Sequence, residues 1–264
     1  MNNLLITVQL IFILVVTFSL LFFIVRNIRK GRIKNIPKGF VIIINGGTGV
    51  GKTTIARELS NKYNIASIFS TDMIREVVRY DIEKYGSLND GFILESSYLA
   101  HVRRKRNLSE SEPDRIINAF KKQCDSLLVP IVKIIFRIRL KRNPMILEGV
   151  NVCATKLFND IPNDPYNRIF FINIYLDSET NHKKRIKKRA QSVNEMKNKT
   201  DKYIDNIKSI RMIDEFLKKD TLKAAINFSS EPENIISIEN SKSVEKTLFK
   251  ISKTLEKKIK LIGQ

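Results

Sequence analysis

Residues 46–54 of the chain read Gly46-Gly47-Thr48-Gly49-Val50-Gly51-Lys52-Thr53-Thr54, which fits the pattern G-x-x-x-x-G-K-[ST] at every fixed position. The β-branched run 40–45 in front of it predicts a buried strand, and the apolar residues Ile55, Ala56 and Leu59 behind it predict a helix. A strand, a glycine loop and a helix in this order are what a phosphate-binding loop requires. A glycine-rich turn that happens to contain a lysine is the alternative, and the two flanks favour the phosphate-binding loop.

This loop predicts that the chain binds ATP together with Mg²⁺. Glycines allow backbone N–H groups to approach phosphates closely, and the N-terminus of the following helix favours their negative charge. All residues of 46–54 are therefore candidate nucleotide ligands. In such loops the lysine, here Lys52, reaches the β- and γ-phosphates, and the hydroxyl of the next residue, Thr53, coordinates the magnesium ion.

The N-terminus carries a long apolar segment. Residues 4–25 contain no charged side chain, and at about 1.5 Å per residue they span roughly 33 Å, enough to cross a hydrocarbon core of about 30 Å. A cleaved signal peptide is the alternative, but it needs a basic leader, which residues 1–3 lack. Residues 26–38 hold six basic side chains and no acidic one. We therefore expect a transmembrane anchor at 1–25, a basic juxtamembrane segment at 26–38, and a single-pass membrane protein whose remaining chain is cytoplasmic.

Residues 39–264 are expected to form one α/β domain, because short apolar runs alternate with helical patterns along them. Strands are expected at 40–45, 65–69, 144–148, 169–176 and 234–238, and helices at 52–63, 73–84, 112–141, 179–218 (broken) and 243–260. This alternation predicts a five-stranded parallel sheet with helices on both faces. In the helix at 112–141, Ser111 is expected to be the N-cap, and Pro130 is expected to kink or divide the helix.

Two carboxylates occupy the ends of predicted strands, where parallel sheets bind ligands. Asp72 follows the second strand, and Glu148 ends the third, where phosphate-loop enzymes carry an acid associated with magnesium. Thr53 and Glu148 are therefore the candidate metal residues. Phosphoryl transfer also needs cations, and a basic run holds Arg185 and Arg189 four residues apart on one helix face. Solvated carboxylates and a solvated basic helix are the alternatives.

The chain is strongly basic, with 47 Lys and Arg against 27 Asp and Glu and a net charge of +20. Such an excess suits nucleic acid, but it is concentrated in short stretches and no basic stripe is interleaved with aromatic residues. Nucleic acid is therefore not expected as a partner. Cys124 and Cys153 have no metal-ligand spacing and are expected to be reduced, buried thiols.

A second motif, more specific than the phosphate loop, reads Ser70-Thr71-Asp72-Met73-Ile74-Arg75-Glu76-Val77-Val78-Arg79. Further distinctive stretches are 94–100, 146–150, the lid-like His182, Arg185 and Arg189, 203–211 and 236–240. In this order, over about residues 40–255, they resemble the 2-phosphoglycerate kinases, a phosphate-loop family of small-molecule kinases with a basic lid, whose second motif is S-T-D-x-I-R-E-V-x-R. The chain departs from the family at Asn151, where a histidine is typical.

The resemblance implies transfer of the γ-phosphoryl group of ATP to a hydroxyl of a small anionic acceptor, with 2-phosphoglycerate giving 2,3-bisphosphoglycerate. The side chains that it assigns to the acceptor are Arg75, Arg79, Glu148 and Arg211. Those that it assigns to catalysis are Lys52, Asp72, Arg185 and Arg189, the last two in a lid at about 179–200. Asp72 would position or deprotonate the acceptor hydroxyl, and the lid arginines would close over the transferring phosphoryl group.

Two other functions stay open at this point, as does the oligomeric state. One is a kinase of the same superfamily with another acceptor, such as a nucleotide sugar in the manner of zeta toxins, or a polyol phosphate. The other is a non-enzymatic, membrane-tethered nucleotide-binding module. Loss of residues such as Asp72 and of the lid arginines would favour the module, and this chain retains them.

Overall fold

The structure, a computed structural model, describes residues 16–19, 36–85, 92–103, 110–161, 168–191, 197–228 and 233–262. The chain divides into two units, Met1–Asn35 and Ile36–Gln264, and each is described by itself. In the first unit the described residues are 16–19, which are helical. The sheet, the phosphate loop and the other elements described below belong to the second unit.

The expectation of a transmembrane anchor at 1–25, and with it of a single-pass membrane protein with a cytoplasmic domain, is contradicted. Among the residues that the structure describes, no helix is both long enough and apolar enough to cross a membrane. Crossing takes about 20 consecutive apolar helical residues, whereas the described helical turn at 16–19 has four. The rest of 1–25, and 26–35 of the juxtamembrane segment, lie outside the described residues.

Five parallel strands form one sheet. They are β1 (Val41–Asn45), β2 (Ser67–Ser70), β3 (Met145–Gly149), β4 (Ile169–Tyr175) and β5 (Ile235–Glu239). Their order across the sheet is β2-β3-β1-β4-β5, so the strand that leads into the phosphate loop lies at the centre. The predicted five-stranded parallel sheet is therefore confirmed, with each strand within two residues of its expected bounds.

Helices lie between these strands and after the last one. They are α2 (Lys52–Tyr63), α3 (Thr71–Tyr85), the 3₁₀ helix η2 (Ser97–Arg103), α4 (Glu112–Leu140), α5 (Ala154–Asp160), α6 (Glu179–Gln191), α7 (Lys197–Asp205), α8 (Ile207–Phe228) and α9 (Val244–Ile262). The broken pattern predicted at 179–218 corresponds to α6, α7 and the first half of α8. The short elements η2 and α5 were not predicted, because neither is long enough to give a clear helical period.

Helix α4 begins as the sequence predicts but does not divide at Pro130. The Ser111 side chain accepts a hydrogen bond from the Asp114 backbone N–H, as an N-cap does. Beyond it the helix runs without interruption through Pro130 to Leu140. Leu127 and Ile131 are buried on either side of the proline. This packing against the sheet keeps the helix whole where local propensity alone would end it.

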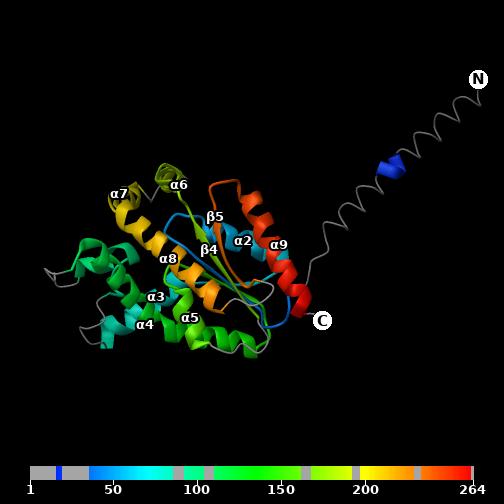
Figure 1. Cartoon of the computed structure of the whole chain (residues 1–264), viewed down its shortest axis with the longest axis horizontal. Helices are drawn as coiled ribbons and strands as arrows, with labels where there is room; N and C mark the ends of the chain where they lie inside the picture. The colour runs from blue at the N-terminus through cyan, green and yellow to red at the C-terminus, as the bar shows by residue number, and fades with distance from the viewer. Residues whose placement is uncertain are drawn as a thin grey trace, which may run out of the picture. The chain divides into compact units, whose positions relative to one another are not determined.

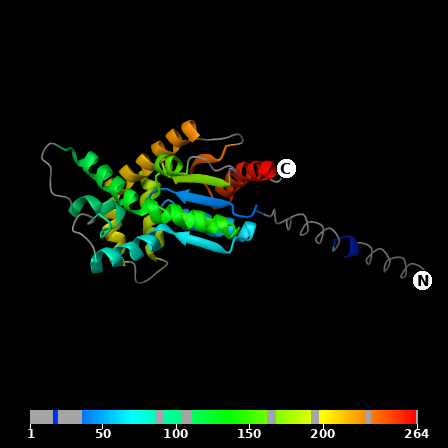
Figure 2. The same ribbon diagram turned by 90° about the horizontal axis from the view of Figure 1, so that it is seen from below.

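Helices cover both faces of the sheet, as predicted. Alternate residues of a strand point to opposite faces, and in β1 they belong to two cores. Ile42 and Ile44 pack with α2 and α9, whereas Val41 and Ile43 pack with α3, α4, α5 and α8. Figure 1 shows α9 beside α2, and α8 near α5 and α4. Figure 2 shows the strands side by side, with β1 in blue between its neighbours.

Candidate active site

The phosphate loop leaves the C-terminal end of β1 and enters α2, whose first residue is Lys52. Gly46 has a φ of 142°, and a Cβ atom there would lie 2.0 Å from the Ile174 carbonyl oxygen. Gly51 has a φ of 103° and is the N-cap of α2. Glycine is therefore required at both positions by backbone conformation and, at Gly46, also by the close approach of β4. The strand, loop and helix expected around the motif are present in this order.

Lys52 folds back over the loop from the first turn of α2. Its Nζ donates a hydrogen bond to the Gly47 carbonyl oxygen at 2.7 Å, and the side chain is buried. The same turn of helix presents backbone N–H groups that lack partners within the helix. A buried ammonium group beside a helix N-terminus is an arrangement suited to an anion.

Thr53 and Glu148, the two predicted metal residues, contact each other. The Thr53 hydroxyl donates a hydrogen bond to Glu148 Oε1 at 3.2 Å. The strand register places Glu148 opposite Ile44 of β1 and Ser70 of β2, so that its buried side chain reaches the start of α2. Hydroxyl and carboxylate oxygens are the hard donors that Mg²⁺ takes, usually together with phosphate oxygens and water. This pair therefore fits a magnesium ion.

Helix α3 carries the three predicted residues of the second motif. Asp72 lies in the first turn and is exposed, and Arg75 Nη2 is 3.6 Å from Asp72 Oδ1 and 3.5 Å from Glu76 Oε1. The Arg75 side chain is only 12 % exposed. Arg79, one turn further, pairs with Glu76 and Glu83 on the surface of the same helix. The structure thus brings Asp72 and Arg75 together and leaves Arg79 in an outer row of ion pairs.

The start of α3 is seated by a close contact between Thr71 and Gly149, the last residue of β3. Thr71 is fully buried, and a Cβ atom at Gly149 would lie 1.7 Å from Thr71 Oγ1. Only glycine leaves room for this approach. The contact holds the first turn of α3, and with it Asp72, at the end of the strand that carries Glu148.

Helix α6 packs against the phosphate loop through His182 and Arg185. His182 Nε2 lies 2.6 Å from the Thr48 carbonyl oxygen, and since a carbonyl oxygen only accepts, Nε2 is the donor. Burial, more than the nearby positive charges, lowers the pKa of His182. Arg185 Nη1 donates to the Val50 carbonyl oxygen at 3.0 Å, and Nη2 donates to that of Asn240. The Arg185 guanidinium therefore lies against the loop backbone. Its contact with a transferring phosphoryl group stays a prediction.

The two other predicted arginines lie on different helices. Arg189 belongs to α6, and its side chain lies outside the part of the chain that the structure describes. Arg211 of α8 donates to the Leu176 carbonyl oxygen at 3.2 Å and to that of Asp177 at 2.6 Å, and its Nε is 3.9 Å from Glu179 Oε2. Arg211 is thus bound to the turn between β4 and α6.

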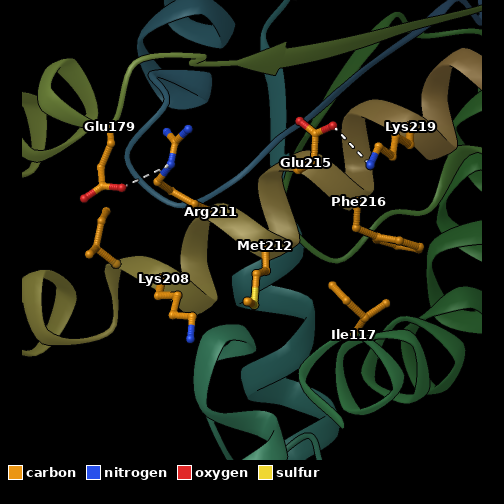
Figure 3. Close-up of a pocket in the computed structure, with 9 residues that line it drawn as sticks. Ile117, Glu179, Lys208, Arg211, Met212, Glu215, Phe216 and Lys219 are labelled. Carbon is orange, nitrogen blue, oxygen red and sulfur yellow. Dashed lines mark ion pairs between the residues drawn. The ribbon is translucent and has the colours of Figure 1, made fainter. Parts of the chain in front are cut away.

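A cavity of about 720 Å³ opens beside Arg211, between α8 and the start of α4. Figure 3 shows Arg211 and Glu179 at one end, and Phe216 and Ile117 at the other. The side chains of α3 and the end of β3 do not line this cavity. This cavity therefore does not bring Arg211 together with the other residues that the resemblance assigned to the acceptor.

Two contacts of the phosphate loop were missed by sequence reasoning. The Asp214 carboxylate of α8 accepts a hydrogen bond from the Gly47 backbone N–H at 2.7 Å. Asn240, directly after β5, donates from Nδ2 to the Val50 carbonyl oxygen at 2.8 Å. Asn240 could have been found, because it follows a predicted strand and so lies at the ligand-binding edge. Asp214 gives no such signal, since it lies in mid-helix.

Comparison with known proteins connects this site to a family. The model of the AAA domain family matches residues 42–206. A protein named 2-phosphoglycerate kinase from Methanococcus maripaludis (strain C6) is 30% identical over 216 residues, which are 79% of this chain and 63% of that protein. Proteins of the same name from Methanocaldococcus jannaschii and Methanopyrus kandleri are 29% and 27% identical, covering 84% and 86% of this chain and 66% and 64% of those proteins. The chain thus spans slightly less than two thirds of the length of these curated relatives.

Among solved structures, a gluconokinase from Sinorhizobium meliloti has a TM-score of 0.44 and 12% identity, and the match covers 86% of this chain and 97% of that one. A shikimate kinase from Aquifex aeolicus has a TM-score of 0.41 and 16% identity, and the match covers 82% of this chain and 96% of that one.

Proposed function

The chain belongs to the AAA domain family, and from this premise we propose that it is an ATP-dependent kinase of small molecules. The observation that carries the proposal is the contact between the Thr53 hydroxyl and the buried Glu148 carboxylate. This oxygen pair adjoins Lys52, whose ammonium group lies over the phosphate loop. A metal-binding pair beside an anion-binding loop is what a kinase needs to hold Mg²⁺ and ATP together.

In the proposed reaction, the backbone N–H groups of residues 46–54 and the Lys52 ammonium bind the phosphates of ATP. Thr53 and Glu148 hold the magnesium ion, which when bound neutralises charge on the β- and γ-phosphates. The oxygen of the acceptor hydroxyl bonds to the γ-phosphorus, and Asp72 takes up the proton that this hydroxyl loses. The bond from the γ-phosphorus to the bridging oxygen breaks, and ADP leaves with that oxygen.

The remaining predicted residues bind negative charge. Arg75, about one turn after Asp72 on α3, offers a planar fork of donors that matches a carboxylate or phosphate. Arg79 and Arg211 are proposed to bind the acceptor more weakly, since Arg79 lies in the outer row of ion pairs and Arg211 donates to two backbone carbonyl oxygens. Arg185 and Arg189 are proposed to turn toward the transferring phosphoryl group when nucleotide binds, as cations that stabilise it.

We propose 2-phosphoglycerate as the acceptor and 2,3-bisphosphoglycerate as the product. Two observations support this choice over other small anions. The second motif, residues 70–79, matches the pattern of the 2-phosphoglycerate kinases, and relatives that carry this name match most of the chain. The proposed Mg²⁺, ATP and small acceptor are the partners that this reaction requires.

The test is to supply the full chain with MgATP and one acceptor at a time, and to identify products by ³¹P NMR. The acceptors are 2-phosphoglycerate, 3-phosphoglycerate, glycerate, a polyol phosphate and a nucleotide sugar. We expect 2,3-bisphosphoglycerate from 2-phosphoglycerate. Another phosphorylated acceptor would keep the kinase and replace its substrate. Binding of ATP with no acceptor phosphorylated would favour a nucleotide-binding module.

A matched pair of lysines on α2 controls for contaminating kinases. Lys52→Ala should lower turnover by roughly 10²–10³-fold or more, because a charged contact to the transition state is lost. Lys62→Ala, at the other end of the same helix, removes a surface pair with Glu256 and a contact with the Tyr63 ring, both away from the loop, and should leave turnover unchanged. Equal activity in both variants would show that the measured kinase is not this chain.

A further inference from the structure

The phosphate loop is held from α8 by a carboxylate that the proposed reaction does not use. Asp214 is 4 % exposed, and both of its oxygens accept hydrogen bonds from backbone amides. Oδ1 accepts from the Gly47 N–H at 2.7 Å, and Oδ2 accepts from the Leu176 N–H at 3.3 Å. A Cβ atom at Gly47 would lie 2.8 Å from Asp214 Cβ, so only glycine permits this approach.

The same contacts tie the loop to the base of α6. Gly47 is held at both of its backbone polar groups, since Lys52 donates to its carbonyl oxygen at 2.7 Å. Both backbone polar groups of Leu176 are also bound, because Arg211 donates a hydrogen bond to the Leu176 carbonyl oxygen at 3.2 Å. Arg211 lies one turn before Asp214 on α8. Leu176 lies between β4 and α6, and α6 in turn contacts the loop at Thr48 and Val50. Asp214 is thus the junction between the two segments.

We propose that Asp214 is a positioning residue of the nucleotide site. Its ionised carboxylate holds the first half of the phosphate loop in the shape that binds the phosphates of ATP, and couples that half to the segment that leads into α6. Two N–H donors need two acceptor oxygens, which an ionised carboxylate provides and an amide or a protonated carboxyl does not. The proposal rests on the proposed function, because it assumes that ATP binds at this loop.

The surroundings of Asp214 set its ionisation. Burial raises the pKa of Asp214 to about 6, against the hydrogen bonds from Gly47 and Leu176 and the charges of Lys52 and Arg211, which lower it. Lys52 comes from α2 and Arg211 from α8 itself. The other charged side chains around the small cavity at this junction are Asp177, Glu215 and Lys218. Below about pH 6 the carboxyl group becomes protonated and loses one of its two acceptors.

The test is the affinity of the full chain for MgATP, measured by calorimetry at pH 7.5 without any acceptor. Asp214→Asn should weaken binding by about tenfold, the scale of losing one charge-assisted hydrogen bond. Asp220→Asn is the matched control, since Asp220 lies on the same helix and accepts a hydrogen bond from the Thr155 backbone N–H at 3.3 Å, away from the loop. Asp220→Asn should leave the affinity unchanged. Asp214→Glu, which keeps both oxygens and the charge, should retain most of the MgATP affinity that Asp214→Asn loses.

A second readout separates positioning from a merely structural role. Phosphate groups of the nucleotide titrate near pH 6 themselves, so the quantity to follow is the ratio of wild-type to Asp214→Asn affinity between pH 5 and 8. This ratio should be about ten above pH 7 and approach one near pH 5. Asp214→Asn should also raise the KM for ATP more than the KM for the acceptor.

The outcomes distinguish this inference from the proposed function. MgATP binding that is unchanged or tighter in Asp214→Asn, or an affinity ratio that is constant with pH, would overturn the inference alone. Absence of MgATP binding by the wild-type chain would overturn the proposed function and the inference together. Circular dichroism and melting of each variant show whether it is folded. If Asp214→Asn does not fold, Asp214→Ser, which is smaller and offers a single oxygen, replaces it in the same comparison with wild type.

Discussion

Asp72 and Arg75 lie one turn apart on α3, and substitutions can separate their proposed roles. Asp72→Asn keeps the shape but cannot accept a proton, so it should lower kcat by roughly 10²–10⁴-fold with little change in the KM for ATP. Arg75→Lys keeps the charge but loses the two-pronged geometry, so it should chiefly raise the KM for the acceptor. Steady-state kinetics with both substrates varied measures the split. The same change of kcat and KM in the two variants would contradict separate roles.

A substitution of Glu148 tests the proposed magnesium site. Glu148→Gln keeps the side chain volume but replaces an anionic ligand by a neutral amide. We expect the Mg²⁺ concentration for half-maximal activity to rise by about tenfold, within the range that changes around a metal typically produce. Activity titrated with Mg²⁺ at saturating ATP gives this value. An unchanged Mg²⁺ requirement would mean that Glu148 only positions Thr53 through their hydrogen bond.

At the scale of elements, a row of polar side chains, two of them fully buried, joins three strands just below the phosphate loop. Asn45 of β1, Asn173 of β4 and Ser237 of β5 are neighbours in the strand register. Asn173 Nδ2 donates to Asn45 Oδ1 at 2.9 Å, and the Ser237 hydroxyl donates to Asn173 Oδ1 at 2.8 Å. Asn45 Nδ2 donates in turn to the Val152 carbonyl oxygen at 3.0 Å. The row connects the central strands to the segment that follows β3.

Asn173 is the middle member of this row, and its removal leaves partners on both sides without a bond. Asn173→Val should lower the free energy of unfolding by about 1–3 kcal/mol, the cost of a buried polar group that loses its partner. Urea denaturation of the full chain measures it. Ser237→Ala is the matched control, because Ser237 ends the row and is only partly buried, and it should cost less. A larger loss in Ser237→Ala than in Asn173→Val would show that the row does not act through its centre.

At the scale of the whole molecule, two buried groups beside the phosphate loop, Asp214 and His182, contribute to the free energy of unfolding. Their contributions change with pH in opposite directions. Burial raises the pKa of Asp214 from 3.8 to about 6, so the folded protein holds this proton more tightly than the unfolded chain does. Its contribution to stability therefore falls as the pH rises from about 4 to about 6. Burial lowers the pKa of His182 from 6.5, so its contribution is present above pH 6.5 and is lost as the pH falls below that value.

Single variants separate these two contributions. The free energy of unfolding of wild type minus that of Asp214→Asn should decrease by at most about 3 kcal/mol between pH 4 and pH 7. The difference between wild type and His182→Gln, which retains a donor for the Thr48 carbonyl oxygen, should instead increase as the pH rises through 6.5. Urea denaturation at pH 4.5, 5.5, 6.5 and 7.5 tests both. Parallel profiles for all three proteins would contradict both assignments.

The strands and the phosphate loop could be predicted because their signals are local. Val41 to Ile44 are β-branched and fully buried, and the glycine spacing of 46–54 leaves few backbone alternatives. The apolar run at 4–25 is equally local, yet the membrane prediction drawn from it is wrong. Hydropathy reports how a segment would partition into lipid, and does not by itself say which structure the segment forms.

By itself, the sequence determined the five strands, their parallel arrangement and the loop at the end of the first, because residues adjacent in the chain carry those signals. Only the tertiary structure decided which distant groups meet. Thr53 and Glu148 are 95 residues apart, and Gly47 and Asp214 are 167 apart. The first pair could be anticipated, since parallel strands bring their C-terminal ends to one edge. The second could not, because the packing of α8 on the sheet, and not any local motif, turns Asp214 toward the loop.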